Sequence, residues 1–225
     1  MSIALLAGLL VVLGTGARVD RPTATPPLAA PTAAPAAEPT PTGPAIVRPA
    51  QIARMLVLGD GLSLGQGATD PSAGFAALVE DAVPLPFAWD VQASAGGTVD
   101  AVFDQADLPD RTDAVVVELG TNDWETVPAA RFVTSYRDRL AGLRDRYPEA
   151  LLLCLGVWQP PSRPETVGYD DAVRAGCESV GGRFVQLSDL FADPANHRSG
   201  QADANPGDAG YRLIADRVVA ELRGT

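Results

Sequence analysis

The chain has 225 residues, of which 46% are hydrophobic and 20% are charged, and its mean hydropathy is +0.07. These values are ordinary for a globular protein, so they exclude a wholly disordered chain and a protein with many membrane spans. The 28 acidic residues outnumber the 17 basic ones, and the net charge is −11. So acidic a protein is poorly suited to phosphate-backbone contacts, and we expect no nucleic-acid partner.

Residues 1–17 are predicted to direct export. An apolar run over 3–13 is followed by small residues ending at Ala17. The run matches a signal peptide in length and is short for a membrane span, which needs about 20 apolar residues. No Lys or Arg precedes it, so an uncleaved N-terminal anchor is the alternative. Either way we expect an extracytoplasmic protein, secreted or tethered to the cell envelope, that meets a membrane only through this segment.

Residues 18–50 are dominated by Pro, Ala and Thr. Such a segment cannot bury enough apolar surface to offset the entropy of ordering, and frequent Pro favours extended polyproline II. We therefore predict a disordered linker that tethers a single folded domain, residues 51–225.

Two cysteines are present, Cys154 and Cys177. In an exported protein this number permits one disulfide, and two separate buried thiols are the alternative. Two Cys with a single His make a poor structural zinc site. We therefore expect no metal and no cofactor.

The domain alternates short apolar runs with amphipathic segments. Near-continuous apolar runs suit strands buried on both faces, and apolar residues spaced three or four apart suit helices. The alternation predicts a three-layer α/β/α fold with about five parallel strands. In chain order the pattern predicts a strand at 54–58, a helix at 72–81, a strand at 87–91, a helix at 98–106, a strand at 114–119, a helix at 127–147, a strand at 151–155, a helix at 168–180, a strand at 183–187 and a helix at 208–222.

Polar clusters follow the first three predicted strands, at 59–63, 96–98 and 120–123, and a fourth at 203–206 precedes the last helix. In an open parallel sheet, ligands bind beyond the carboxyl ends of the strands. The clusters are therefore expected to meet in one site.

The four clusters, in this order and spacing, resemble the SGNH or GDSL hydrolases, a family of esterases, lipases and carbohydrate acetylesterases. The resemblance covers nearly all of residues 53–223 and implies a flavodoxin-like SGNH-hydrolase fold. In that family a Ser within a Gly-Asp-Ser-Leu block is the nucleophile. Amides of the Ser, a Gly and an Asn form the oxyanion hole, and an Asp-x-x-His block before the last helix supplies the acid and the base.

The resemblance assigns the oxyanion positions to Asn122 and to Gly97, with Gly96 as the off-by-one alternative. It gives Asp60 a role in organising the turn rather than in attack. Thr121 belongs to the block that contains Asn122, so we expect it in the ligand pocket with Asp60 and Gly96.

The catalytic positions depart from the family pattern. Gly61 stands at the nucleophile position, Asn205 at the His position and Ala202 at the Asp position. A triad acts as a unit, and removing one member can cost on the order of 10⁶ in rate. Departures from the family pattern at all three catalytic positions indicate that the triad is lost.

Three other residues are candidates for a rearranged catalytic site. Ser63 is the nearest hydroxyl to Gly61, but two residues along an incipient helix correspond to about 200° of rotation, so it is expected to face away. His197, the only His, is most simply an exposed loop residue, and a general base is the alternative. Asp203 is a carboxylate near the His position, and it is a weak base for a Ser hydroxyl without a His.

Trp124 and Trp158 follow two strand ends, and we place both in the ligand pocket, with packing onto the core as the simpler alternative. The sequence thus predicts an exported family member without a working triad. It would serve as a binding or accessory module for a small-molecule, glycan or acyl ligand, with acylated carbohydrate as the first class to consider. An active carboxylic-ester hydrolase using Ser63, His197 or Asp203 is the alternative. The sequence carries no prediction of oligomeric state.

Overall fold

A computed structural model describes residues 44–45, 51–83, 88–160, 164–198 and 205–224. The predicted signal segment, residues 1–17, lies outside the described residues, as does nearly all of the predicted linker, 18–50. Among the described residues, no helix combines the length and the apolar character needed to cross a membrane.

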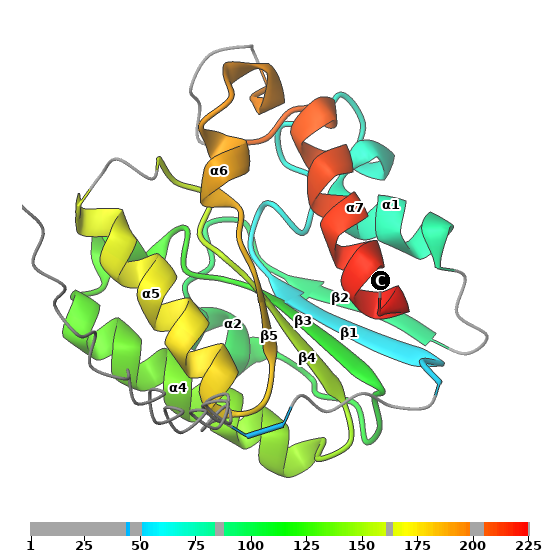
Figure 1. Cartoon of the computed structure of the whole chain (residues 1–225), viewed down its shortest axis with the longest axis vertical. Coiled ribbons are helices and arrows are strands. Elements are labelled where there is room, and N and C mark those ends of the chain that lie inside the picture. Colours follow the sequence, from blue (N-terminus) through cyan, green and yellow to red (C-terminus); the bar gives the residue numbers. More distant parts are fainter. Residues whose placement is uncertain (1–43, 46–50, 84–87, 161–163, 199–204, 225) are drawn as a thin grey trace, which may run out of the picture. The chain divides into compact units, whose positions relative to one another are not determined.

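The core of the domain is a five-stranded parallel sheet with the strand order β2-β1-β3-β4-β5 (Figure 1). This confirms the predicted fold class, and the order is that of flavodoxin-like folds. Each strand matches a predicted apolar run, although the last is shorter than expected. The strands are β1 Arg54–Gly59, β2 Ala88–Ala93, β3 Ala114–Glu118, β4 Leu151–Leu155 and β5 Arg183–Val185.

Helices connect the strands and cover both faces of the sheet (Figure 1). The five predicted helices are present, and four short elements that the pattern did not predict lie between them. The long elements are α1 Phe75–Ala82, α2 Val99–Gln105, α4 Ala129–Arg146, α5 Pro164–Ser179 and α7 Asp208–Arg223. The short ones are η1 Pro71–Ala73, α3 Asp123–Thr126, α6 Ser188–Phe191 and η2 Pro194–Asn196.

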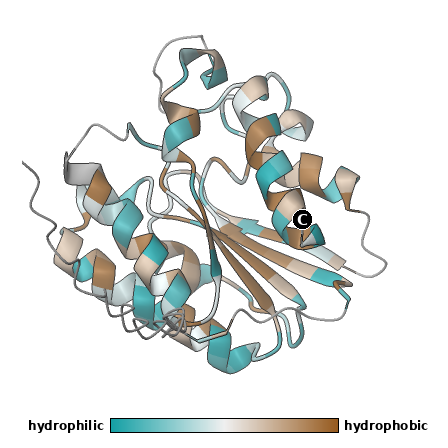
Figure 2. Cartoon of the chain, in the orientation of Figure 1, coloured by the Kyte–Doolittle hydropathy of each residue, from teal (hydrophilic) through white to brown (hydrophobic). Residues whose placement is uncertain are grey.

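Two hydrophobic clusters lie on opposite faces of the sheet because successive strand side chains point to opposite sides. On β1, Val57 belongs to the cluster under α1 and α7, whereas Leu56 and Leu58 belong to the cluster under α2, α4 and α5. In Figure 2 the central strands are coloured mainly as hydrophobic, whereas the helices carry both hydrophobic and hydrophilic residues. This arrangement explains why the strands read as continuous apolar runs.

Cys154 of β4 and Cys177 of α5 form a disulfide, with their Cα atoms 6.1 Å apart. Both residues are fully buried in the cluster that α4 and α5 cover. The bond therefore fastens α5 to the sheet, as the pair of cysteines had suggested.

The strand order places a crevice at the carboxyl ends of β1 and β3. β1 pairs with β2 on one side and with β3 on the other, so the chain reverses its direction of winding at this point. In open α/β sheets, ligands bind at such a topological switch point. The clusters at 59–63 and 120–123 lie at these two strand ends.

Candidate functional site

The turn after β1 is organised by the buried carboxylate of Asp60. Its Oδ1 accepts a hydrogen bond from the Leu62 amide at 2.9 Å, which closes a tight Asx-type turn over Gly61. Its Oδ2 accepts one from Asn122 Nδ2 at 2.6 Å. Asp60 therefore joins the ends of β1 and β3 directly.

The Ser63 hydroxyl points into the interior. It donates to Oε2 of Glu118 at 2.9 Å, and the Asp60 amide donates to the same oxygen at 3.2 Å. The Ser63 residue is 5% exposed and Glu118 is 1% exposed. The hydrogen bond between Ser63 and Glu118 requires glycine at position 59, because a Cβ atom there would lie 1.9 Å from Ser63 Oγ.

Asp60 and Glu118 form a buried acid pair. Burial raises the pKa of Asp60 to about 6, and the nearby Asp123 carboxylate adds to the effect. Burial also raises the pKa of Glu118 well above its ordinary value, and the charge of Asp60 raises it further. Two carboxylates in such proximity cannot both ionise cheaply, so Glu118 retains a proton where Asp60 is ionised.

The oxyanion positions differ in their hydrogen bonding. Asn122 Nδ2 donates to Asp60 Oδ2 and to the Gly97 carbonyl, the latter at 3.2 Å, so protein acceptors engage both of its amide hydrogens. The Gly97 amide donates to the Ser94 carbonyl at 2.8 Å and the residue is buried. Of the two neighbouring glycines, Gly96, which has φ +70°, lines the cleft and Gly97 does not. The alternative assignment to Gly96 therefore describes the lining better.

A polar cleft of about 250 Å³ lies over these strand ends. It brings together most of the residues singled out from the sequence, although they come from four separate segments. Asn205 and Gly61, which the sequence analysis assigns to the family His and nucleophile positions, lie in the same cleft. The lining residues are Asp60, Gly61, Leu62, Gln66, Gly96, Thr121, Asn122, Trp124, Glu125, Gln159 and Asn205.

Trp158 does not line this cleft, contrary to the sequence-based placement. The residue is 0% exposed, and its ring packs against Phe191 and His197 with centroids 5.3 and 5.4 Å away. Its backbone amide donates to Thr121 Oγ1 at 3.1 Å. The apolar area of the indole favours the core over the cleft, and the neighbouring Gln159 lines the cleft instead.

His197 is buried rather than exposed, so the simplest expectation for this residue was wrong. It is 3% exposed, and its ring meets Phe191 edge-on at 4.5 Å between centroids. Its Nε2 lies 2.7 Å from the Phe191 carbonyl. An imidazole held in this way packs the segment before α7 onto α6.

Two predicted site residues, Ala202 and Asp203, lie outside the described residues. Their assignments as the family Asp position and as a substitute carboxylate remain predictions.

Four residues of the site region were missed by sequence reasoning: Gln66, Glu118, Glu125 and Gln159. Glu118 carried a signal, because it is a carboxylate at the end of the otherwise apolar run 114–119. Gln66 lies between two glycines, Gly65 and Gly67, which indicates a special backbone turn.

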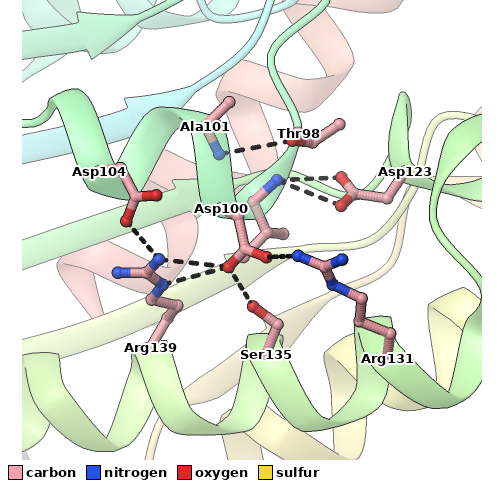
Figure 3. A network of polar contacts seen from close by, with 9 residues as sticks. Thr98, Asp100, Ala101, Asp104, Asp123, Arg131, Ser135 and Arg139 are labelled. Carbon is pink, nitrogen blue, oxygen red and sulfur yellow. Dashed lines mark hydrogen bonds and ion pairs between the residues drawn. The ribbon is translucent and has the colours of Figure 1, made fainter.

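Asp123 anchors the neighbouring helix to the site. Both of its carboxylate oxygens accept from the Val99 amide, at 3.2 and 3.1 Å, so Asp123 caps the first turn of α2 (Figure 3). Burial raises the pKa of Asp123 to about 6. The next residue of α2, Asp100, contacts Arg131 and Arg139 of α4, which ties α2 to α4 (Figure 3).

Comparisons with known proteins agree with this geometry. The sequence profile of the GDSL-like Lipase/Acylhydrolase family matches residues 57–213. Cellulase/esterase CelE from Acetivibrio thermocellus is 30% identical over 114 residues, which is 48% of this chain and only 14% of CelE.

Solved structures share the fold at low identity. The crystal structure of TesA superposes with a TM-score of 0.62 at 22% identity, covering 76% of this chain and 98% of TesA. A family two carbohydrate esterase from Clostridium thermocellum in complex with cellohexaose gives a TM-score of 0.57 at 22% identity, covering 80% of this chain and 65% of the esterase. Fold and cleft together define an α/β protein of the SGNH-hydrolase class. The chain belongs to the GDSL-like lipase/acylhydrolase family.

Proposed function

We propose that this protein is an exported binding or accessory module whose cleft binds a ligand without hydrolysing it. One observation carries the proposal: the nucleophile position is Gly61, and a Cβ atom there would lie 2.0 Å from Gln66 Oε1. The exposed side chain of Gln66, in the same loop, lies in the space that a side chain at position 61 would enter.

The remaining cleft chemistry supports binding rather than proton transfer. Among the described lining residues, Thr121 carries the one hydroxyl, and it is buried and accepts from the Trp158 amide. Asn205 is a carboxamide, which cannot act as a general base near neutral pH. Hydrogen-bond donors and substrate binding alone accelerate hydrolysis by roughly 10³–10⁴ over the rate in water, so any residual hydrolysis would be very slow.

The alternative, an active ester hydrolase with a rearranged site, finds less support. The Ser63 hydroxyl is engaged by the buried Glu118 on the far side of the turn from Gly61. The His197 ring is enclosed by Phe191 and Trp158. A nucleophile and its base need mutual hydrogen-bond reach and access to the substrate, and neither side chain is presented to the cleft.

Acylated carbohydrate is the proposed ligand class. The names of the similar proteins, a cellulase/esterase and a carbohydrate esterase bound to cellohexaose, favour sugars. Trp124 lines the cleft and supplies an aromatic face, the Asn122 carbonyl supplies an acceptor, and the Asn205 carboxamide supplies a donor and an acceptor. Such a combination suits stacking and hydrogen bonding to a neutral sugar.

Export is part of the proposal. The buried disulfide between Cys154 and Cys177 supports it, because disulfides persist in oxidising compartments and are rare in the cytosol. The apolar segment at 3–13 supports it from the sequence.

Calorimetric titration of the full chain with partially acetylated cellohexaose tests the function, with acetate release measured in the same sample. We expect saturable binding, weakened at least about tenfold by Trp124→Ala because the stacking surface is lost, and no acetate above the buffer level. Leu213→Ala, at an exposed position on α7, is the matched control and should bind like the unmodified chain. Acetate release that Ser63→Ala abolishes would establish the esterase alternative, and absence of binding would refute the ligand class.

A further inference from the structure

The loop after β1 carries one side chain back over Gly61. Besides the 2.0 Å approach to Gln66 Oε1, a Cβ atom on Gly61 would lie 2.7 Å from Gln66 Cδ. A side chain at position 61 would therefore require the exposed Gln66 carboxamide to move to another rotamer. Gln66 therefore occupies the place of the nucleophile.

The backbone of Gln66 is held at both ends. Its amide donates to the Gly61 carbonyl at 2.8 Å, and its carbonyl accepts from the hydroxyl of Tyr211 at 2.5 Å. Tyr211 is fully buried on α7. Because the backbone is already held, binding would order only the exposed Gln66 side chain and not the loop that carries it, which is compatible with a recognition role.

The glycines on either side of Gln66 allow this loop to pack closely against the opposite wall of the cleft. Gly65 and Gly67 have φ values of +72° and +99°, a region that favours glycine. A Cβ atom on Gly67 would lie 2.6 Å from Asn205 Cβ and 2.5 Å from the Pro206 carbonyl. The loop thus abuts Asn205, and Gln66 and Asn205 line one cleft together.

The charges of the residues that line the cleft limit which classes of ligand can bind there. Among the described residues around the cleft, four are carboxamides, two are carboxylates and none is a cation. A carboxamide both donates and accepts hydrogen bonds, which matches hydroxyl and amide groups. Two carboxylates without a cation disfavour an anion by repulsion. The four carboxamides are Gln66, Asn122, Gln159 and Asn205.

We propose that Gln66 is the specificity-determining residue of the cleft, and that its carboxamide, standing where the nucleophile's side chain would be, hydrogen-bonds to a neutral hydroxyl or amide group of the ligand. This rests on the proposed function, in which the cleft binds without hydrolysis. It also implies that Gln66, in this rotamer, competes with a serine side chain at position 61 for the same space.

The occupancy of the nucleophile's place is tested by covalent labelling with a fluorophosphonate probe. In a Gly61→Ser/Asn205→His background, we expect Gln66→Ala to raise the labelling rate at position 61 at least about tenfold, since the hydroxyl becomes accessible to the probe. Leu213→Ala, at an exposed position on α7 and not in the cleft lining, is the matched control and should leave the rate unchanged. Equal rates with and without Gln66→Ala would overturn the proposal.

The recognition role is tested by titration of the full chain with partially acetylated cellohexaose and with cellohexaose. Gln66→Ala should weaken binding at least about tenfold, and Gln66→Glu should weaken it comparably because the carboxylate lacks the donor. Melting temperatures within a few degrees of the unmodified chain would show that both variants fold, as expected for an exposed side chain. Unchanged affinity in Gln66→Ala would overturn this proposal alone, whereas absence of binding by the unmodified chain would overturn the proposed function as well.

Discussion

Glu118 determines where Ser63 points. Its carboxyl oxygen accepts from the Ser63 hydroxyl and from the Asp60 amide, so a single buried acid holds the turn after β1. The resulting turn directs Gly61 toward the cleft and Ser63 away from it. The rotation expected along an incipient helix anticipated this separation, but the partner of Ser63 could not be known from spacing alone.

The protonated state of Glu118 leads to the first prediction. Glu118→Gln preserves a neutral acceptor for Ser63 and a donor toward Asp60, so its free energy of unfolding should stay near that of the unmodified protein at pH 5. Glu118→Ala leaves two buried donors unsatisfied and opens a cavity, and it should cost about 3 kcal/mol or more. Urea titrations of the two variants measure this. Equal losses in both would contradict a protonated Glu118.

The same acid pair predicts a dependence of stability on pH. The folded-state pKa of Asp60 is raised to about 6, and that of Glu118 is raised as well. Groups with raised folded-state pKa values stabilise the fold below their unfolded pKa, and this contribution is lost as pH rises through the folded value. Glu118→Gln should therefore flatten the fall in melting temperature between pH 4 and about pH 7. A slope identical to that of the unmodified protein would contradict the account.

Whether an individual side chain faces the cleft or the core could be predicted from the sequence for some residues only. Asp60, Asn122, Trp124 and Asn205 could be placed in the cleft because each lies beside a strand end or the last helix, where the topology dictates the location. Trp158 follows a strand end equally closely but is buried. The direction of a side chain depends on packing partners such as Phe191 and His197, which are distant along the chain or carry no local signal.

At the scale of elements, α5 depends on the disulfide between Cys154 and Cys177. The helix packs against α4 and the sheet, and it also supplies Asp170, whose Oδ1 accepts from the Val157 amide at 3.0 Å beside the cleft. The bond closes a separation of 23 residues. Cross-linking a loop of this length is worth about 3 kcal/mol, mainly through the unfolded chain.

A double Cys154→Ala/Cys177→Ala variant should therefore lose about 3 kcal/mol of unfolding free energy, measured by urea denaturation. Reductant should lower the stability of the unmodified protein and leave the double variant unchanged, which serves as the control. Equal stability of the two proteins without reductant would contradict this contribution.

Helices and strands could be predicted where their burial leaves a regular pattern of apolar residues in the sequence. β1, β3 and β4 are buried on both faces and appear in the sequence as apolar runs. The edge strand β5 has three residues, fewer than predicted, because it pairs with β4 only over Arg183–Val185. The short helix α3 was missed because four residues cannot show a helical period.

At the scale of the whole molecule, the strand order creates the site and the loops alter its chemistry. A flavodoxin-like sheet offers a crevice at the ends of β1 and β3, and the same crevice serves many functions in different proteins. In the proposed function, Gly61 and Asn205 stand at two catalytic positions of the family, and the Gln66 side chain lies over Gly61. Family membership thus establishes the fold, and the site residues argue for binding.

The most direct test of this account is the turnover of p-nitrophenyl acetate by the purified full chain, with Ser63→Ala and Asn122→Ala measured beside it. We predict turnover at the buffer level in all three proteins, because the described lining residues include no imidazole and only one hydroxyl, that of the buried Thr121. Turnover well above buffer that Ser63→Ala abolishes would contradict the account and show that this protein is an esterase with a relocated nucleophile.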